Sequence, residues 1–490
     1  MPNKNLLLEI GTEELPPKSL KQLMLSLEKN LAGELSKAGF VFAGTKSFAT
    51  PRRLAVFVED LAETQEDQEV EKRGPAIKAA FDGSGEPTRA LMGFAKSCGV
   101  EDLSTLETLS TDKGEWLVYK ATQPGKSLSD EIDQLIANSL VNLPIERRMR
   151  WGNSRMESVR PVHWIVLLHG SDILPGVVLG HTTGRTTRGH RFMSDGDYEV
   201  ASANDYLDVL KSASVIADFN LRRQKISEQL QQKAETLNGN LELDDSLLDE
   251  VTALVEWPCA LTGSFDESFL EVPEEALISA MKEHQRYFHL TNNNGKLLPN
   301  FITVSNIESK EPTAVIAGNE RVIRPRLSDA SFFFKKDAST TMDEKLERLA
   351  NVVFQSELGT FLEKAQRVSN LAEFIGNIAG AEPSDCKRAG LLCKADLVSD
   401  MVGEFPDLQG IMGSYYSLND GESNDVSLAI REHYLPSQSG GALPANIVGS
   451  CVALADKIDT LVGLFSIGQP PTGSRDPFAL RRQALGVIRI

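Results

Sequence analysis

The first 40 residues constrain the local fold more than any other stretch of the chain. Leu6–Ile10 is a mostly apolar run, which predicts a buried strand. Gly11 permits a turn, and Pro17 suits the first position of a helix, where a missing N–H costs no hydrogen bond. Leucines then recur at helical spacing, at positions 20, 23, 27 and 31, and Gly39 suits the end of the helix. The chain is therefore expected to open with a strand, a turn and an amphipathic helix.

Length and composition indicate a large globular protein. At 490 residues the chain is too long for one ordinary core, so we expect about three or four domains. Hydrophobic residues at 41% and charged residues at 24% are typical of a soluble globular protein. No apolar run is long enough to cross a bilayer, and the N-terminus lacks a basic segment followed by an apolar signal core. These features predict a cytoplasmic protein with no membrane partner.

The charge distribution limits the kind of nucleic-acid binding that is possible. A net charge of −18 argues against nonspecific binding, which draws its affinity from excess Lys and Arg. Acidic residues gather at 63–69 and 242–250, while arginines cluster elsewhere. This segregation predicts no general DNA binding but permits a specific RNA surface. The five cysteines form no Cys-x-x-Cys pair, so neither a disulfide framework nor a zinc ribbon is expected.

Strand and helix signals divide the chain into four blocks. Strands are expected at 54–58, 165–168 and 298–304, the acidic run 63–69 is expected to be a solvated connection, and helical periods dominate beyond about residue 340. We predict a multidomain α+β protein, with mixed α/β N-terminal domains followed by an all-α domain. The predicted blocks are an α+β region at 1–70, an α+β domain with an Arg/Trp cluster at 71–200, an α+β domain at 201–335 and an all-α domain at 336–490.

Three arginine clusters are the positive signal for an RNA partner. The first interleaves guanidinium groups with indoles, a mixture suited to phosphates and unstacked bases. The second lies in a Gly- and Thr-rich turn, and the third precedes three phenylalanines and two lysines. For each cluster the alternative is a solvated face or pairing with the abundant acids. The candidates are Arg147, Arg148, Arg150 and Trp151 in the first cluster, Arg188 and Arg191 in the second, and Arg324 and Arg326 in the third.

The helical block resembles an HD-type phosphohydrolase domain without its metal ligands. Metal-dependent members place a His before an Arg-Val pair, a His-Asp dyad after a Leu-Leu pair and a later Asp, because divalent cations need several nitrogen and oxygen ligands. Here Lys364 stands at the first position, Cys393 and Lys394 stand at the dyad, Asp396 is displaced by two residues, and Asp456 matches. An ammonium group has no lone pair for a metal, so we predict no metal site. The expected alternative is an ion pair between Lys394 and either Asp396 or Asp456.

Longer motifs resemble one family along the whole chain. The opening Glu9-Ile10-Gly11-Thr12-Glu13-Glu14-Leu15-Pro16-Pro17 closely resembles the start of the β subunit of bacterial heterotetrameric glycyl-tRNA synthetase. Ordered matches follow at 51–55, 72–76, 111–116, 149–152, 188–193, 298–301, 318–327, 404–413 and 476–482. Motifs matched to this family add Arg52, Arg53, Arg481 and Arg482 to the RNA-binding candidates.

The resemblance implies a division of labour between two chains. In the family a separate α chain carries the class II active site, which uses ATP and Mg²⁺, and the β chain supplies tRNA recognition in an α2β2 assembly. This chain is therefore expected to bind tRNA(Gly) and the α subunit, and to have no catalytic residue and no cofactor of its own. Family members continue into a C-terminal helical anticodon-binding domain. Because the sequence stops within a predicted amphipathic helix at Ile490, we expect it to be part of a longer protein.

Two other functions stay open from the residues alone. One is a metal-dependent phosphohydrolase of the HD type, centred on Asp396 and Asp456. The other is a scaffold that binds no RNA. Stoichiometric divalent metal in the purified protein would favour the first, and the glycylation of tRNA by a full-length version mixed with the α chain would discriminate the second.

Overall fold

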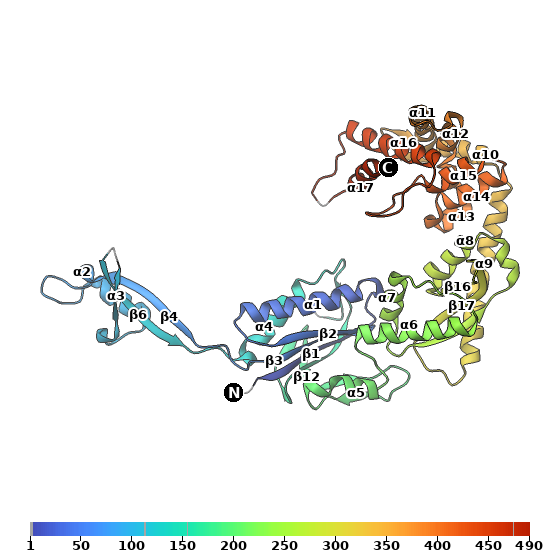
Figure 1. Cartoon of the computed structure of the whole chain (residues 1–490). Helices are drawn as coiled ribbons and strands as arrows, with labels where there is room; N and C mark the ends of the chain where they lie inside the picture. The colour runs from blue at the N-terminus through green and yellow to red at the C-terminus, as the bar shows by residue number, and fades with distance from the viewer. Residues whose placement is uncertain (1–2, 112–113, 154, 474) are drawn as a thin grey trace. The chain divides into compact units, whose positions relative to one another are not determined.

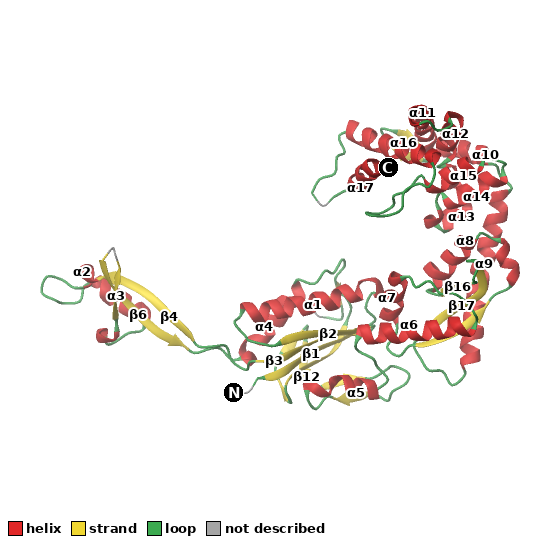
Figure 2. Ribbon diagram, viewed as in Figure 1, coloured by secondary structure: helices red, strands yellow, loops and turns green. Residues whose placement is uncertain are grey.

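The computed structural model of the chain describes residues 3–111, 114–153, 155–473 and 475–490 (Figure 1). The chain divides into two compact units, neither of which is continuous in sequence. The first unit comprises Met1–Ser227, Leu248–Cys259 and Ser305–Glu308, and the second comprises Glu228–Leu247, Ala260–Val304 and Ser309–Ile490. Sheets and helices mix in the N-terminal region, and the C-terminal region is mostly helical (Figure 2). The finer division into four blocks stays a prediction.

A seven-stranded sheet forms the centre of the first unit. The strand order is β11-β12-β9-β1-β3-β2, and β10 pairs with β9 beside this path. β1 lies antiparallel between β3 and β9, while β12 runs parallel to β9. The predicted strands at the N-terminus, at 54–58 and at 165–168 are confirmed and pair with one another. The strands are β1 (Lys4–Thr12), β2 (Gly44–Thr50), β3 (Arg53–Leu61), β9 (Val162–His169), β10 (Asp172–Ile173), β11 (Val177–Val178) and β12 (His181–Gly184).

Helices cover both faces of this sheet. On one face, α1 (Pro17–Lys37) and α4 (Leu128–Val141) pack against Leu6, Leu8 and Ile10 of β1. On the other face, α5 (Tyr206–Ser212) packs against Leu7 (Figure 1). Burial on two faces explains why β1 is apolar at consecutive positions instead of alternating. Pro17 begins α1, and the leucines at positions 20, 23, 27 and 31 are buried, as the sequence predicted.

A small sheet with two short helices follows β3 along the chain. It pairs β4 (Gln68–Ala76), β6 (Gly114–Gln123) and β5 (Glu107–Thr111) around a core of Ala80, Leu91 and Leu117. The predicted solvated connection at 63–69 is too long, because β4 begins at Gln68. Within the matched motif at 111–116, residues 112 and 113 lie outside the described residues. The helices here are α2 (Ile77–Ala80), α3 (Arg89–Cys98) and the short η1 (Leu103–Thr105).

Several short elements complete the first unit and lead into the second. The two-stranded pairs are β7 (Met149–Arg150) with β8 (Glu157–Ser158), and β13 (Thr186–Arg188) with β14 (Asp197–Glu199). η2 (Ala203–Asp205) precedes α5. Both α6 (Phe219–Thr236) and α7 (Asp245–Leu254) contribute residues to each unit.

The second unit begins with a three-stranded sheet and continues as helices. The sheet order is β15 (Cys259–Ser264), β17 (Leu297–Ser305) and β16 (Phe288–Thr291), which confirms the strand predicted at 298–304. The long α9 (Pro312–Ala338) starts before the predicted boundary at 335 and crosses it. Near this sheet lie η3 (Glu267–Glu271), α8 (Glu274–Ser279) and η4 (Ala280–His284).

The helices beyond residue 340 pack around one apolar core. Two of them begin with capping boxes, Thr341 with Glu344 and Thr360 with Glu363, so the sequence itself marks their first turns. The prediction of an all-α block is slightly wrong, because β18 (Val353–Gln355) and β19 (Gly359–Thr360) form a short hairpin. The elements are α10 (Met342–Arg348), η5 (Leu349–Asn351), α11 (Phe361–Ala379), α12 (Pro383–Leu392), η6 (Ala395–Val398), α13 (Asp400–Glu404), η7 (Pro406–Leu408), α14 (Ile411–Asn419), α15 (Asn424–Glu432), α16 (Ile447–Ser466) and α17 (Leu480–Arg489). None of the helices in the described ranges is long and apolar enough to cross a membrane.

Candidate functional site

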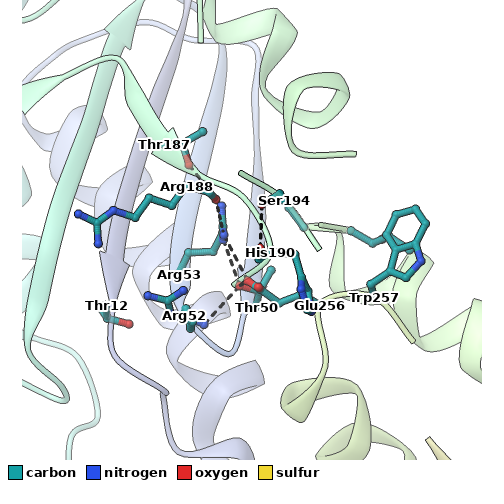
Figure 3. A network of polar contacts seen from close by, with 12 residues as sticks. Thr12, Thr50, Arg52, Arg53, Thr187, Arg188, His190, Ser194, Glu256 and Trp257 are labelled. Atoms are coloured by element: carbon teal, nitrogen blue, oxygen red, sulfur yellow. Dashed lines mark hydrogen bonds and ion pairs between the residues drawn. The ribbon is translucent and has the colours of Figure 1, made fainter. Parts of the chain in front are cut away.

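A buried polar network lies at the first residue of β3. Arg53 is fully buried, and its guanidinium donates to Thr50 Oγ1 at 3.1 Å, Thr187 Oγ1 at 3.3 Å and the Arg188 carbonyl at 2.8 Å. A fourth bond joins Arg53 Nη2 to Glu256 Oε1 at 3.2 Å (Figure 3). The whole fork of the guanidinium is therefore used inside the protein.

Two buried carboxylates balance the charge of Arg53. Glu256 is one, and Glu9 Oε2 lies 3.6 Å from Arg53 Nη1. Burial by itself lowers the pKa of Arg53, but the carboxylates of Glu256 and Glu9 outweigh it and raise that pKa above its usual value. Glu9 also accepts hydrogen bonds from the Trp164 indole and from Thr187 Oγ1. Arg53 was predicted as an RNA contact, and its burial makes it a structural residue instead.

Trp164 organises the arginines on the rim of this network. Its ring lies against Gly11 of the opening motif, where a Cβ atom would overlap the indole. The Arg52 Cζ atom lies 5.9 Å from the Trp164 ring centroid, and the Arg188 Cζ atom lies 5.0 Å from it. Both distances suit cation–π contacts. We call Arg52, Trp164, Arg188 and Arg191 the Trp164 cluster.

The turn that carries Arg188 and Arg191 is held by His190. Its buried Nδ1 accepts hydrogen bonds from the backbone N–H groups of Phe192 and Met193, both at 3.2 Å. Ser194 Oγ donates to the His190 carbonyl at 2.7 Å (Figure 3). These local bonds explain why the motif 188–193 has a histidine between its two arginines.

The acids of the opening motif pair with this cluster. Arg191 lies 3.3 Å from Glu13 and 2.9 Å from Glu14, and His163 Nε2 lies 2.9 Å from Glu13 Oε1. Burial raises the pKa of Glu13, but His163, Glu14 and Arg191 together bring it below its usual value. The alternative of intramolecular pairing therefore holds for Arg191. Arg52 is half-buried, and both burial and the nearby Arg191 lower its pKa.

The first arginine cluster lies on the β7–β8 hairpin of the same unit. Arg150 pairs with Glu157 at 2.5 Å, and Arg148 donates to the Val141 carbonyl at 2.8 Å. Arg147 is exposed and forms no ion pair within the part of the chain that the structure describes. Trp151 packs partly against the core beneath α1. This cluster presents more exposed charge than the Trp164 cluster.

Arg160 connects the two clusters. Its Nε donates to the Glu14 carbonyl at 2.9 Å, and its Nη1 lies 3.5 Å from Met149 Sδ. Glu14 in turn pairs with Arg191. The hairpin and the Trp164 cluster therefore form neighbouring parts of one surface.

The remaining RNA candidates lie in the second unit. Arg324 is exposed on α9, and Arg326 lies 3.7 Å from Glu404. Arg481 and Arg482 are exposed in the first turn of α17. These four residues belong to the second unit, and the arginine surface described above belongs to the first.

At the HD-like positions, two lysines share buried carboxylates. Lys364 Nζ lies 2.9 Å from Asp456 Oδ1 and 3.1 Å from Asp459 Oδ2, and it donates to Thr460 Oγ1 at 2.7 Å. Lys394 Nζ lies 2.9 Å from Asp456 Oδ2, so the predicted Lys394–Asp456 ion pair is present. Burial opposes ionisation of Asp456, but the two lysines bring its pKa well below the usual value.

Asp396 lies apart from this pair. Its Oδ2 accepts from the backbone N–H groups of Gly410 at 2.6 Å and Gly413 at 3.0 Å, and burial nevertheless raises its pKa to about 6. The alternative ion pair between Lys394 and Asp396 is therefore wrong. Cys393 donates to the Gly390 carbonyl at 3.3 Å, and burial raises its pKa to about 12, which keeps it a thiol.

The comparisons with known proteins agree over the whole chain. The family model described as "Glycyl-tRNA synthetase beta subunit" matches residues 6–490. The glycine–tRNA ligase beta subunit of Marinobacter nauticus is 51% identical over 492 residues, which cover all of this chain and 71% of the relative. Those of Pseudoalteromonas atlantica and Mannheimia succiniciproducens are 50% and 51% identical, over 99% and 100% of this chain and 70% and 71% of the relatives.

The chain belongs to the glycyl-tRNA synthetase beta subunit family. This confirms the resemblance carried by the motifs from Glu9 to Arg482, and it makes the chain a subunit of a glycine–tRNA ligase. In this chain the opening motif has two structural roles. Gly11 admits the Trp164 ring, and Glu13 and Glu14 hold Arg191.

The donor set at the HD-like positions of the beta subunit does not fit a pair of divalent cations. Two ammonium groups occupy the space between the carboxylates, and each has donors only. Among the described residues, no group of three His, Cys, Asp or Glu side chains could hold a metal ion. No step of metal-dependent phosphate hydrolysis can be derived from these residues.

Sequence reasoning missed several residues of both sites. Glu256 is 203 positions from Arg53, and nothing local marks it as a partner. His433 is fully buried, and its Nε2 accepts a hydrogen bond from Lys394 Nζ at 2.9 Å. Its other ring nitrogen donates to the Ile430 carbonyl, so Nε2 is the acceptor, and burial together with Lys394 keeps its pKa well below the usual value. A histidine of this kind has no sequence signal.

Proposed function

We propose that this chain is the tRNA-binding, non-catalytic subunit of glycine–tRNA ligase in the cytoplasm. A separate α subunit would carry out the ATP-dependent attachment of glycine to tRNA(Gly) in an α2β2 assembly and would use the ATP and Mg²⁺. This chain would contribute RNA contacts and orientation, with no cofactor of its own. Family membership over residues 6–490 supports the assignment.

One observation carries the RNA-binding part of the proposal. A chain with a net charge of −18 gathers arginines on one surface of its first unit, from the β7–β8 hairpin through Arg160 to the Trp164 cluster. Guanidinium groups form paired hydrogen bonds with phosphates, and this geometry favours Arg over Lys. A local basic surface on an acidic protein supports one specific RNA site rather than general binding.

The exposed arginines of the hairpin are the best RNA contacts on this surface. Arg147 has no internal ion pair among the described residues, and Arg148 and Arg150 keep most of their guanidinium groups at the surface. Arg52, Arg188 and Arg191 would contribute at the rim of the Trp164 cluster. Arg324, Arg326, Arg481 and Arg482 are proposed as further contacts in the second unit.

A triple variant of the hairpin tests the proposal. Arg147→Gln, Arg148→Gln and Arg150→Gln together should weaken tRNA(Gly) binding at least tenfold and lower the slope of log affinity against log salt by about 2. Binding would be measured by filter retention at four salt concentrations, and glycylation would be measured with added α subunit. The matched control replaces two exposed lysines of the first unit, Lys29→Gln and Lys211→Gln. Equal affinity and salt slope in the triple variant and the control would reject this surface.

We further propose that the helical part has an HD-like fold that has lost its metal ligands. In such a fold the ammonium groups of Lys364 and Lys394 would take the place of the metal ions and neutralise Asp456 by direct ion pairs. Restoring the family pattern with Lys364→His, Cys393→His and Lys394→Asp should create a site for about one or two Mn²⁺ per chain, measured by electron paramagnetic resonance. Lys387→Asp, at an exposed position, serves as the control. A folded triple variant that binds no more Mn²⁺ than the control would contradict the HD-like assignment.

A further inference from the structure

A pocket of about 730 Å³ lies in the helical part of the second unit. Its walls come from α11, α16 and α17 and from the segment after α15. Among the described residues, the pocket is lined by four cationic side chains, Lys364, Lys394, Lys457 and Arg482, and by two carboxylates, Asp407 and Asp456. The pocket is large enough for a small organic ligand, since such sites commonly measure about 300 to 1,000 Å³.

Two of these cations have no carboxylate partner among the described residues. Lys364 and Lys394 are neutralised by Asp456 and Asp459, as described above. Lys457 Nζ instead donates to the carbonyls of His433 at 3.2 Å and Leu435 at 2.7 Å. Arg482 is exposed at the pocket and forms no ion pair in the described ranges.

Lys457 is the more informative of the two. Its side chain is buried, and an ammonium group has three N–H donors, of which the two carbonyls use two. A buried cation is costly, and burial lowers the pKa of Lys457 to about 8 even though the neighbouring Asp456 carboxylate raises it. At pH 7 the group still carries most of its positive charge. An anion in the pocket would take the third donor and balance that charge.

Aromatic side chains form the other part of the lining. Phe354, Phe361, Tyr434 and Phe478 are each partly exposed there. The Lys394 ammonium lies 3.9 Å from the Tyr434 ring centroid, and Lys364 lies 4.7 Å from that of Phe354. Sites that stack a nucleic-acid base and bind its phosphate combine exposed aromatic rings with cationic side chains.

We propose that this pocket binds a nucleoside phosphate, with the phosphate group held by Lys457 and Arg482 and the base against the aromatic wall. The ligand is either a free nucleotide or the corresponding part of an RNA chain, because the two present the same chemistry. The pocket includes the HD-like positions Lys364, Lys394 and Asp456, but the two residues proposed to hold the phosphate, Lys457 and Arg482, are not among them. It binds and does not hydrolyse, since the adjacent carboxylates are held by Lys364 and Lys394.

AMP is the probe for the free nucleotide. Titration of the whole chain at pH 7 by isothermal calorimetry should give one saturable site, and inorganic phosphate should compete for it. Arg482→Gln and Lys457→Met should each weaken AMP binding at least tenfold. Arg489→Gln is the matched control, because it is exposed on the same helix and does not line the pocket. Arg482 is exposed, so its variant keeps the test valid if Lys457→Met fails to fold.

tRNA(Gly) is the probe for the RNA source. If AMP does not bind, Lys457→Met should still weaken tRNA binding at least threefold, because Lys457 is buried and lines the pocket. The proposal is overturned if AMP does not bind and tRNA binding is unchanged in Lys457→Met, or if AMP binds equally well to both variants and the control. Either result leaves the test with Arg147, Arg148 and Arg150 unaffected.

Discussion

Arg53→Met should destabilise the first unit by about 3 kcal/mol. Removing one partner of a buried charge pair costs roughly 3 to 5 kcal/mol, because the opposite charge stays buried. Here Glu9 and Glu256 would both lose the guanidinium. The loss should lie at the lower end, because Glu256 keeps the Thr50 hydroxyl at 2.7 Å and Glu9 keeps Trp164 and Thr187. Methionine occupies most of the stem volume, so the cavity contribution is small.

Urea unfolding followed by tryptophan fluorescence measures this loss directly. The four tryptophans, Trp116, Trp151, Trp164 and Trp257, all belong to the first unit, so their signal reports on that unit. Arg191→Met is the matched control, since this exposed ion pair should contribute less than about 1 kcal/mol. The double variant with both Arg53→Met and Glu256→Gln should regain about 1 kcal/mol or more of the lost unfolding free energy, because the second substitution removes one uncompensated buried charge.

Three results would refute this reasoning. One is a loss below about 1 kcal/mol for Arg53→Met, which would mean that the buried carboxylates do not depend on the guanidinium. Another is normal stability combined with a large loss of tRNA binding, which would return Arg53 to the RNA-contact role predicted from the sequence. Equal effects of Arg53→Met and Arg191→Met would also contradict the assigned difference in burial.

Two further substitutions test other parts of the structure. Gly11→Ala should destabilise the first unit by about 1 to 3 kcal/mol, because the added Cβ overlaps the Trp164 ring; an unchanged urea midpoint would show that the ring can move aside. Asp396→Asn keeps a hydrogen-bond acceptor for the N–H groups of Gly410 and Gly413 but removes the ionisable carboxyl group. In the folded state the pKa of Asp396 is raised to about 6 from its ordinary value of 3.8, so the folded protein binds this proton more tightly than the unfolded chain does. The protonated Asp396 therefore stabilises the fold fully below pH 3.8, and this stabilisation is lost as the pH rises through 6. Thermal unfolding should therefore show the wild type gaining about 2.5 kcal/mol relative to Asp396→Asn between pH 7 and pH 4, and a pH-independent difference would exclude this titration.

The sequence by itself determined the features that depend on near neighbours and on motif order. The strand, turn and helix at the start follow from an apolar run, Pro17 and leucines at helical spacing, and all three are present. The family is also a property of the sequence, because ordered motifs from Glu9 to Arg482 specify it. Local patterns are sufficient here, since hydrogen bonds within a helix and the spacing of apolar residues involve positions only a few residues apart.

Only the tertiary structure decided what each charged residue does. Arg52 and Arg53 are adjacent and chemically identical, yet Arg53 enters the buried network while Arg52 stays at its rim, because Arg53 is the first residue of β3 and Arg52 lies in the turn before it. Asp396 and Asp456 were equal candidates for Lys394, and only Asp456 is within reach. Charge pairing depends on which distant segments meet, and Glu256 reaches Arg53 across 203 residues of chain. Strand pairing and core packing bring Glu256 and Arg53 into contact, and no local sequence pattern encodes that contact.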